Sequence, residues 1–133
     1  MTRIIKESSH VNAGIAYFGT NGAKYFPLKK NNYLVIDMSI GKVKLGSTNP
    51  FEIEKLLNKG VTVFSRRSLH AKFLITNKSL LVGSANISKT AREIQHEAAI
   101  YCEDKLSIEK AKYFFNKKEK STYNGCPRPF TCR

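Results

Sequence analysis

The stretch LHAKFLITNKSLLVGSANIS, residues 69–88, decides the fold of this chain. It holds two apolar runs, LHAKFLIT and SLLVG, which the polar pair Asn77-Lys78 joins. A short polar connection between two apolar runs predicts a β-hairpin. The second run stops at Gly83, where small and polar residues take over. The stretch therefore predicts two neighbouring antiparallel strands followed by a sharp turn.

Strands and helices alternate in the residues around this hairpin. The further strands are expected at residues 12–19, 33–39, 61–65 and 97–102. The first helix is expected at residues 50–59, with Thr48 or Asn49 as N-cap, Pro50 at the first position and Gly60 as the stop. Two more helices are expected, at residues 89–95 with Ser88 as cap and at residues 108–120 with Ser107 as cap. The last helix is predicted to bury Ile108, Ala111, Phe114 and Phe115.

This order predicts an α/β fold with a mixed β-sheet flanked by helices. A chain of 133 residues is long enough for one such domain, which we expect at residues 1–120, followed by a loose C-terminal tail at 121–133. The three cysteines, Cys102, Cys126 and Cys132, predict reduced thiols and a cytoplasmic protein. No apolar run approaches the length of a membrane-spanning helix, so no membrane insertion is expected.

The charge of the chain is strongly positive. Lys and Arg number 23 against 10 Asp and Glu, which gives a formal net charge of +13. Such a field attracts polyanions, so nucleic acid is the first expected partner, an anionic membrane surface the second and acidic proteins the third. Three basic residues, Lys24, Arg66 and Arg67, are candidates for binding phosphate groups, and solvated surface charge is an equally good interpretation of the two arginines.

The hairpin also carries polar residues that are suited to chemistry. His70 and Lys72 alternate with Ala71 and therefore project from one face of a strand. The turn after the second strand supplies the Ser84 hydroxyl and the Asn86 amide, and such donors beside an opening helix form an anion-binding corner. Glu97 begins the next strand, where its carboxylate is expected to accept the far ring N–H of His70 and fix the tautomer. The segment therefore predicts a phosphate site that needs no metal or cofactor.

A metal-dependent nuclease is the weaker alternative. Such enzymes need clustered carboxylates near a lysine, and Asp37 with Glu103 and Lys105 imitates that pattern without a fixed spacing.

The residues HAKFLITN, GSAN and the downstream Glu97 resemble the catalytic motif of the phospholipase D superfamily. That motif is His-x-Lys followed by four residues and an Asp, then Gly-Ser-x-Asn and a Glu. The resemblance implies a phospholipase D-like fold with one half-site per chain. It implies that His70 is a nucleophile that forms a phosphohistidine, that Lys72, Asn86 and Ser84 hold the phosphate, and that Glu97 orients His70. Asn77 stands where the motif has its Asp.

The family needs a second histidine as general acid, and this chain carries one such motif. Small bacterial nucleases of the family pair two identical chains, so the resemblance implies a homodimer with a shared site. We therefore expect a metal-independent phosphodiesterase that cleaves nucleic acid, with DNA favoured over RNA. Two alternatives stay open. One is a catalytically inactive nucleic-acid-binding module, in which Asn77 in place of the motif Asp would mark the loss of activity, and the other is a phospholipid phosphodiesterase.

Overall fold

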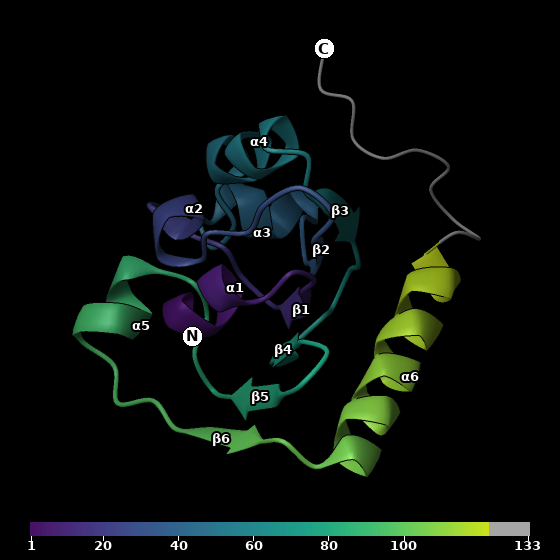
Figure 1. Cartoon of the computed structure of the whole chain (residues 1–133). Coiled ribbons are helices and arrows are strands. Elements are labelled where there is room, and N and C mark those ends of the chain that lie inside the picture. Colours follow the sequence, from purple (N-terminus) through teal and green to yellow (C-terminus); the bar gives the residue numbers. More distant parts are fainter. Residues whose placement is uncertain (123–133) are drawn as a thin grey trace.

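A computed structural model describes residues 1–122, and for residue 90 and residues 117–122 it describes the backbone only. Within these residues the chain forms one six-stranded sheet with helices on both faces (Figure 1). The strands are β1 (Asn12–Ile15), β2 (Tyr33–Ile36), β3 (Thr62–Ser65), β4 (Lys72–Ile75), β5 (Leu80–Gly83) and β6 (Ala99–Cys102). The helices are α1 (Thr2–Glu7), α2 (Gly22–Tyr25), α3 (Ile40–Lys44), α4 (Pro50–Asn58), α5 (Lys89–Glu93) and α6 (Lys105–Thr122). This confirms the α/β class with a mixed sheet.

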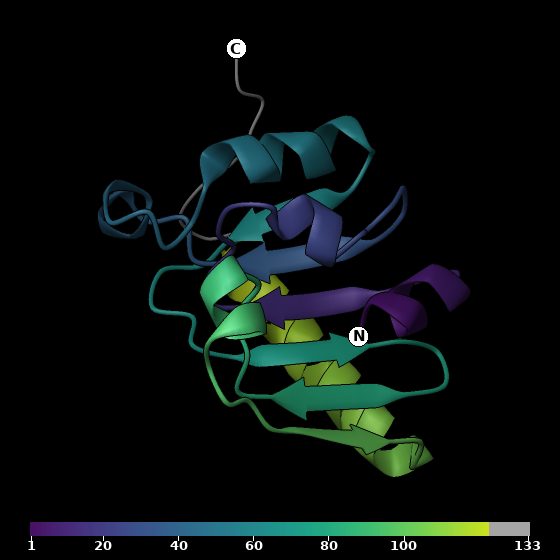
Figure 2. The same ribbon diagram turned by 90° about the vertical axis from the view of Figure 1, so that its left-hand side faces the viewer.

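The strand order brings distant parts of the chain together. The order is β3-β2-β1-β4-β5-β6, with β1, β2 and β3 parallel and each later pairing antiparallel. Lys72, the first residue of β4, therefore lies opposite Ile15, the last residue of β1. The ends of β1, β2, β3 and β5 and the beginnings of β4 and β6 share one end of the sheet, at the left in Figure 2. We call it the catalytic end, after the candidate catalytic residues that the sequence predicts in the segments there.

Each face of the sheet carries its own apolar core. Ile15, Leu34 and Leu74 pack with buried residues of α1, α2 and α4 on one face. On the other face α6 packs alone against the sheet, through Ile108 and Phe115 (Figures 1 and 2). Alternating residues of β2 thus serve both cores, which is why this strand has no charged residue along its length.

The region around α4 folds as its sequence predicts. The Asn49 side chain accepts the Phe51 amide at 3.0 Å, and Pro50 opens the helix. Glu52 is 4% exposed, and its carboxylate accepts the Ala23 amide at 3.0 Å and the Lys55 ammonium at 2.7 Å. Burial raises the pKa of Glu52, but the hydrogen bonds outweigh it and hold that pKa below its ordinary value.

Three expectations about helices and strands need correction. The strand expected at 12–19 ends at Ile15, because the chain turns there toward α2. The last helix begins at Lys105, not after Ser107, because the Asp104 carboxylate accepts the Ser107 amide at 2.8 Å and so occupies the cap position. Phe114 is 43% exposed and lies beside the buried stripe of α6, not within it.

The sequence does not predict α1, α2 and α3, which are four to six residues long. The expected tail lies outside the described residues apart from the end of α6, and so do Cys126 and Cys132. No helix of residues 1–122 is both long enough and apolar enough to cross a membrane.

Candidate active site

The polar residues of the hairpin region gather at the catalytic end of the sheet. His70 lies just before β4, and Ser84 follows β5 directly. Glu97 lies two residues before β6, and the register places Gly83 opposite Ala99. Three predicted site residues from segments up to 27 positions apart therefore lie at the same end as the loops that follow β1, β2 and β3.

His70 and Lys72 form the centre of the site. The Lys72 Nζ lies 3.4 Å from His70 Nε2 and donates a hydrogen bond to the His70 carbonyl oxygen at 3.1 Å. Ala71 packs on the α6 side of the sheet, so the alternation predicted from the sequence is present. His70 is exposed and Lys72 is half-buried, which leaves the imidazole open to a ligand with a fixed ammonium beside it.

Asn86 reaches this centre through the segment that follows β1. Its Oδ1 accepts the Tyr17 amide at 3.2 Å, and the Tyr17 ring meets the His70 ring edge-on at 6.3 Å between centroids. A parallel bridge between Phe18 and Ile87 fixes the two segments against each other. Asn86 is thus linked to His70 through Tyr17, whose backbone amide contacts the Asn86 side chain and whose ring meets the imidazole.

Ser84 and Glu97 form a second pair at the same end. The Ser84 hydroxyl donates a hydrogen bond to the Glu97 carboxylate and accepts the Ala98 amide at 3.1 Å. In this structure the carboxylate therefore meets Ser84, whereas the sequence led us to expect a contact with His70.

Asp37, which the sequence placed only in the alternative carboxylate pattern, supports the site at the end of β2. It is 1% exposed at the end of β2, and its two oxygens accept the Ser39 amide at 2.9 Å and the Ser68 amide at 3.0 Å. Burial raises the pKa of Asp37, but these hydrogen bonds and nearby Lys42 outweigh it and lower that pKa below its ordinary value. Ser68 has a φ of +64°, so the carboxylate holds a left-handed turn two residues before His70.

Lys42, on α3, adds a positive charge next to Tyr17. Its Nζ lies 4.7 Å from the centroid of the Tyr17 ring. Contact with the Tyr17 side chain, and to a smaller extent the charge of Asp37, raises the pKa of Lys42 above its ordinary value. The sequence did not predict a role for Lys42, because it is one of many basic residues and nothing local links it to the hairpin.

The three basic residues predicted to bind phosphate, Arg66, Arg67 and Lys24, lie at different distances from the site along the fold. Arg66 and Arg67 follow β3 and form the turn that leads to His70, and Arg67 is exposed. Arg66 is tied to the sheet by its amide, which donates to the Ile36 carbonyl at 2.8 Å. Lys24 is exposed on α2, which packs against α4. The two arginines thus belong to the catalytic end, and Lys24 lies on a neighbouring helix.

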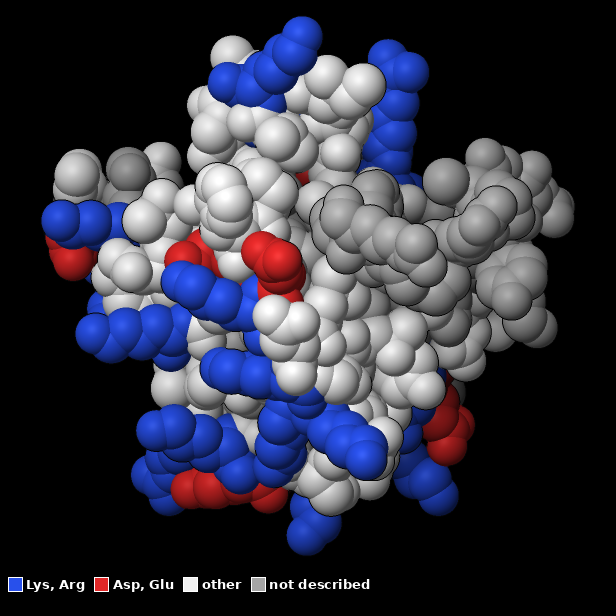
Figure 3. All heavy atoms as spheres, turned by 90° about the horizontal axis from the view of Figure 1, so that it is seen from above, with Lys and Arg blue, Asp and Glu red and all other residues white. Residues whose placement is uncertain are grey.

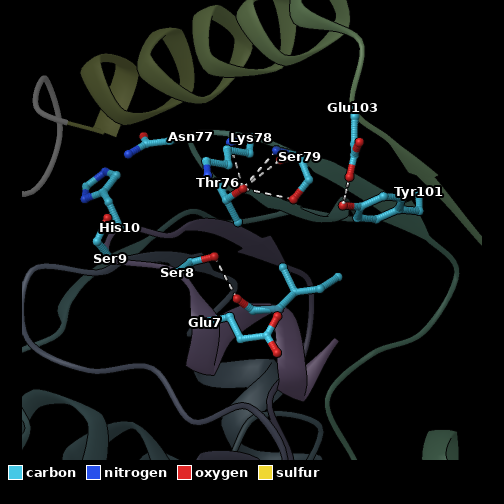
Figure 4. Close-up of a pocket in the computed structure, with 11 residues that line it drawn as sticks. Glu7, Ser8, Ser9, His10, Thr76, Asn77, Lys78, Ser79, Tyr101 and Glu103 are labelled. Carbon is cyan, nitrogen blue, oxygen red and sulfur yellow. Dashed lines mark hydrogen bonds between the residues drawn. The ribbon is translucent and has the colours of Figure 1, made fainter.

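Asn77 lies at the opposite end of the sheet, in the exposed turn between β4 and β5. Six residues, 71–76, separate it from His70, and an extended run of this length corresponds to roughly 20 Å. It lines a pocket of about 420 Å³ that also includes His10, Glu7, Tyr101 and Glu103 (Figure 4). Two carboxylates line this pocket, so it is poorly suited to a phosphodiester.

The alternative carboxylate pattern is wrong as a single site. Asp37 lies at the catalytic end, whereas Glu103 follows β6 at the end that holds Asn77. Among residues 1–122 no group of three or more His, Cys, Asp or Glu side chains is placed to hold a metal ion. The catalytic end offers an imidazole, ammonium groups and neutral donors, together with the carboxylates of Asp37 and Glu97, which serine donors already hold.

Comparisons with known proteins agree with this geometry. The family described as "Cardiolipin synthase, PLD-like domain" matches residues 33–118, which include β2 to β6 and most of α6. No curated protein matches the chain significantly.

Several solved structures share the fold. NucT from Helicobacter pylori is 21% identical over 88% of this chain and 83% of its own, with a TM-score of 0.65. Nuc from Salmonella typhimurium, a phospholipase D family member, is 16% identical over 88% of this chain and 82% of its own, with a TM-score of 0.64. TrmBL2, an archaeal chromatin protein described as binding DNA, is 11% identical over 90% of this chain and 47% of its own, with a TM-score of 0.56.

Proposed function

The chain belongs to the PLD-like domain family of the phospholipase D superfamily and is a phosphodiester hydrolase of that class, and we propose that it is a metal-independent nuclease. The observation that carries the proposal is the grouping of His70, Lys72 and Asn86 at one end of the sheet. An exposed imidazole beside a fixed ammonium and an amide is suited to attack on a bound phosphate.

In the proposed reaction His70 Nε2 attacks the phosphorus of a phosphodiester. A P–N bond forms as the P–O bond to the leaving oxygen breaks, and water then hydrolyses the phosphohistidine and restores the imidazole. Lys72 is close to Nε2, at 3.4 Å, so its ammonium would meet the phosphate oxygens. The Asn86 amide nitrogen would donate a further hydrogen bond. On substrate binding the Ser84 hydroxyl would turn from Glu97 to the phosphate, and the released Glu97 carboxylate would orient His70.

The leaving oxygen needs a proton, and one chain has one His-x-Lys segment. We propose that His70 of a second copy supplies this proton, so that the site is shared across a homodimer. Mixing wild type with His70→Ala protein tests this. A shared site predicts that activity per wild-type chain falls as the variant is added, and strict proportionality to wild-type concentration would contradict it.

Nucleic acid is the favoured substrate because of charge. The net charge is +13, and on the face seen in Figure 3 Lys and Arg side chains are spread widely with few acidic ones between them. Arg66 and Arg67 lie next to His70 in sequence, where they would contact the phosphates of a long substrate, and Lys24 would contribute from α2. DNA is the first substrate to test, and a DNA-binding protein with this fold supports that choice.

The deciding experiment measures cleavage of plasmid DNA in EDTA by wild type, His70→Ala and the control His10→Ala. His10 lines the pocket at the opposite end of the sheet, so its removal tests loss of an imidazole away from the site. We expect nicking by wild type and His10→Ala, none by His70→Ala, and a phosphoenzyme in acid-quenched wild type. Complete inhibition by EDTA would refute the metal-independent mechanism.

Two further measurements on the same proteins, DNA binding and liposome turnover, separate the two alternatives. Asn77 departs from the family motif, and a disarmed site would bind DNA equally well with and without His70 and cleave none. A phospholipid phosphodiesterase would turn over liposomes faster than DNA. Either outcome would refute the nuclease proposal.

A further inference from the structure

A groove adjoins the candidate site on the side of α3 and α5. Its volume is about 410 Å³, within the range of pockets that hold small ligands. It shares two residues with the site, since Tyr17 and Asn86 line both. The other lining residues are Gly19, Thr20, Leu45, Gly46, Ser47, Ser88, Lys89 and Gln95. A ligand held by Asn86 would therefore lie beside this groove.

The lining has the chemistry of an anion and hydroxyl site. It includes four hydroxyl side chains, one of them the phenol of Tyr17, and two glycines, and no Asp or Glu is among the residues that line it. Gly46 has a φ of +71° and no side chain, so the wall there is bare backbone. The pocket at the opposite end of the sheet differs, because Glu7 and Glu103 line it (Figure 4).

Two lysines supply positive charge at this groove. Lys89 lines it directly, and its ammonium lies 3.8 Å from Glu93 in an exposed pair. Such a pair contributes little, so a phosphate can take the place of the carboxylate. Lys42 lies against the ring of Tyr17, which forms the wall shared with the site.

We propose that this groove binds the nucleotide next to the scissile phosphate, with Lys89 and Lys42 on the neighbouring phosphate and Ser47 and Thr20 along the sugar. The inference rests on the proposed nuclease function and adds a substrate requirement to it. A diester with no nucleotide on that side loses these contacts, so the enzyme discriminates in favour of polynucleotides over small phosphodiesters.

The first test compares Lys89→Ala with Lys78→Ala in a His70→Ala background. Both lose one positive charge, but Lys78 lies in the turn between β4 and β5 at the opposite end of the sheet. Binding of a short fluorescent DNA oligonucleotide is measured against salt concentration. Loss of one phosphate contact reduces the slope of log K against log salt by about 0.7 to 0.9. We expect this reduction for Lys89→Ala and an unchanged slope for Lys78→Ala, and equal slopes in the two variants would overturn the proposal.

The second test fills the groove. Ser47→Trp is compared with Ser9→Trp, which adds the same bulk in the pocket of Figure 4. The measured quantity is the ratio of kcat/KM for the oligonucleotide to kcat/KM for bis(p-nitrophenyl) phosphate. We expect this ratio to fall by about tenfold, or about 1.4 kcal/mol, in Ser47→Trp alone.

The outcomes separate this inference from the nuclease proposal. A wild type that cleaves neither substrate refutes the nuclease proposal, while the salt slopes remain readable because binding needs no turnover. A nuclease whose substrate ratio is the same in Ser47→Trp and wild type refutes the groove inference alone. Melting temperatures of all four variants within a few degrees of wild type show that the comparison is between folded proteins.

Discussion

Replacement of Asp37 by alanine is the perturbation whose effect the structure defines most fully. The carboxylate is 1% exposed and accepts two backbone amides, those of Ser39 and Ser68. The first amide lies in the loop after β2, and the second precedes His70 by two residues. Asp37→Ala therefore removes the connection between two loops at the catalytic end and leaves both amides without their acceptor.

The size of the effect follows from these two contacts. A hydrogen bond to a charged group contributes about 1.5–3 kcal/mol, so two contribute roughly 3–6 kcal/mol when fully buried. Both amides lie in partly buried loops where water can replace the carboxylate in part. We expect Asp37→Ala to lower the free energy of unfolding by about 2–4 kcal/mol. Asp37→Asn keeps one acceptor oxygen and should lose about half as much.

The effect should depend on pH in one direction. The pKa of Asp37 is lower in the folded protein than its ordinary value of 3.8, so the unfolded chain takes up the proton first as pH falls. The contribution of the carboxylate is therefore complete above about pH 5 and is lost as pH falls through the folded pKa. The difference between wild type and Asp37→Ala should be constant from about pH 5 to 8 and shrink below about pH 4.

Urea unfolding of the three proteins at several pH values measures this difference. DNA cleavage is assayed in parallel below the melting temperature of each variant. Release of the left-handed turn at Ser68 frees His70 from its position, so Asp37→Ala should lose activity even where it is fully folded. A cost below about 1 kcal/mol at pH 7, or a difference that grows as pH falls, would refute the reasoning.

Three further predictions concern stability, and urea unfolding checks each of them. Glu52→Gln should cost about 1–3 kcal/mol above pH 5 and less below pH 4, because the folded pKa of Glu52 is lowered; a cost that is independent of pH would contradict this. Gly14→Ala should cost about 1–3 kcal/mol, since a Cβ there would lie 2.5 Å from the Phe73 ring, and a stabilised variant would show that the ring moves freely. Phe115→Ala should lower the free energy of unfolding by about 3–5 kcal/mol, because the ring is 2% exposed. The control Tyr113→Ala on the same helix, where the side chain is 70% exposed, should lower it by less than about 1 kcal/mol, and equal losses would contradict the packing of α6.

The sequence predicts those elements that local signals specify. The hairpin around Asn77 pairs Ile75 with Leu80, five positions apart. The cap at Asn49 and the cap at Ser88, whose hydroxyl accepts the Ala91 amide at 3.1 Å, join residues two and three positions apart. The His70 and Lys72 pair follows from the two-residue period of a strand. These features are present because backbone geometry alone brings their residues together.

The short helices α1, α2 and α3 were not predicted because their local sequences carry too little helix-forming signal. Helices of four to six residues have little intrinsic stability, and packing decides whether they form. In α1 the anchoring residue is Ile5, which is fully buried in the core. In α2 the amide of Ala23 is held by Glu52, which comes 29 residues later in the chain.

The site likewise has features that the sequence predicts and features that only the tertiary structure shows. The sequence by itself determined which groups are available: an imidazole and an ammonium on one strand, a serine and an asparagine after the next strand, and an excess of positive charge. Only the tertiary structure decided their neighbours. Tyr17 meets Asn86 across 69 residues, and Asp37 meets the Ser68 amide across 31. Such contacts depend on the order and direction of the strands, and β1 next to β4 is a pairing that the burial of both cores selects and no local pattern encodes.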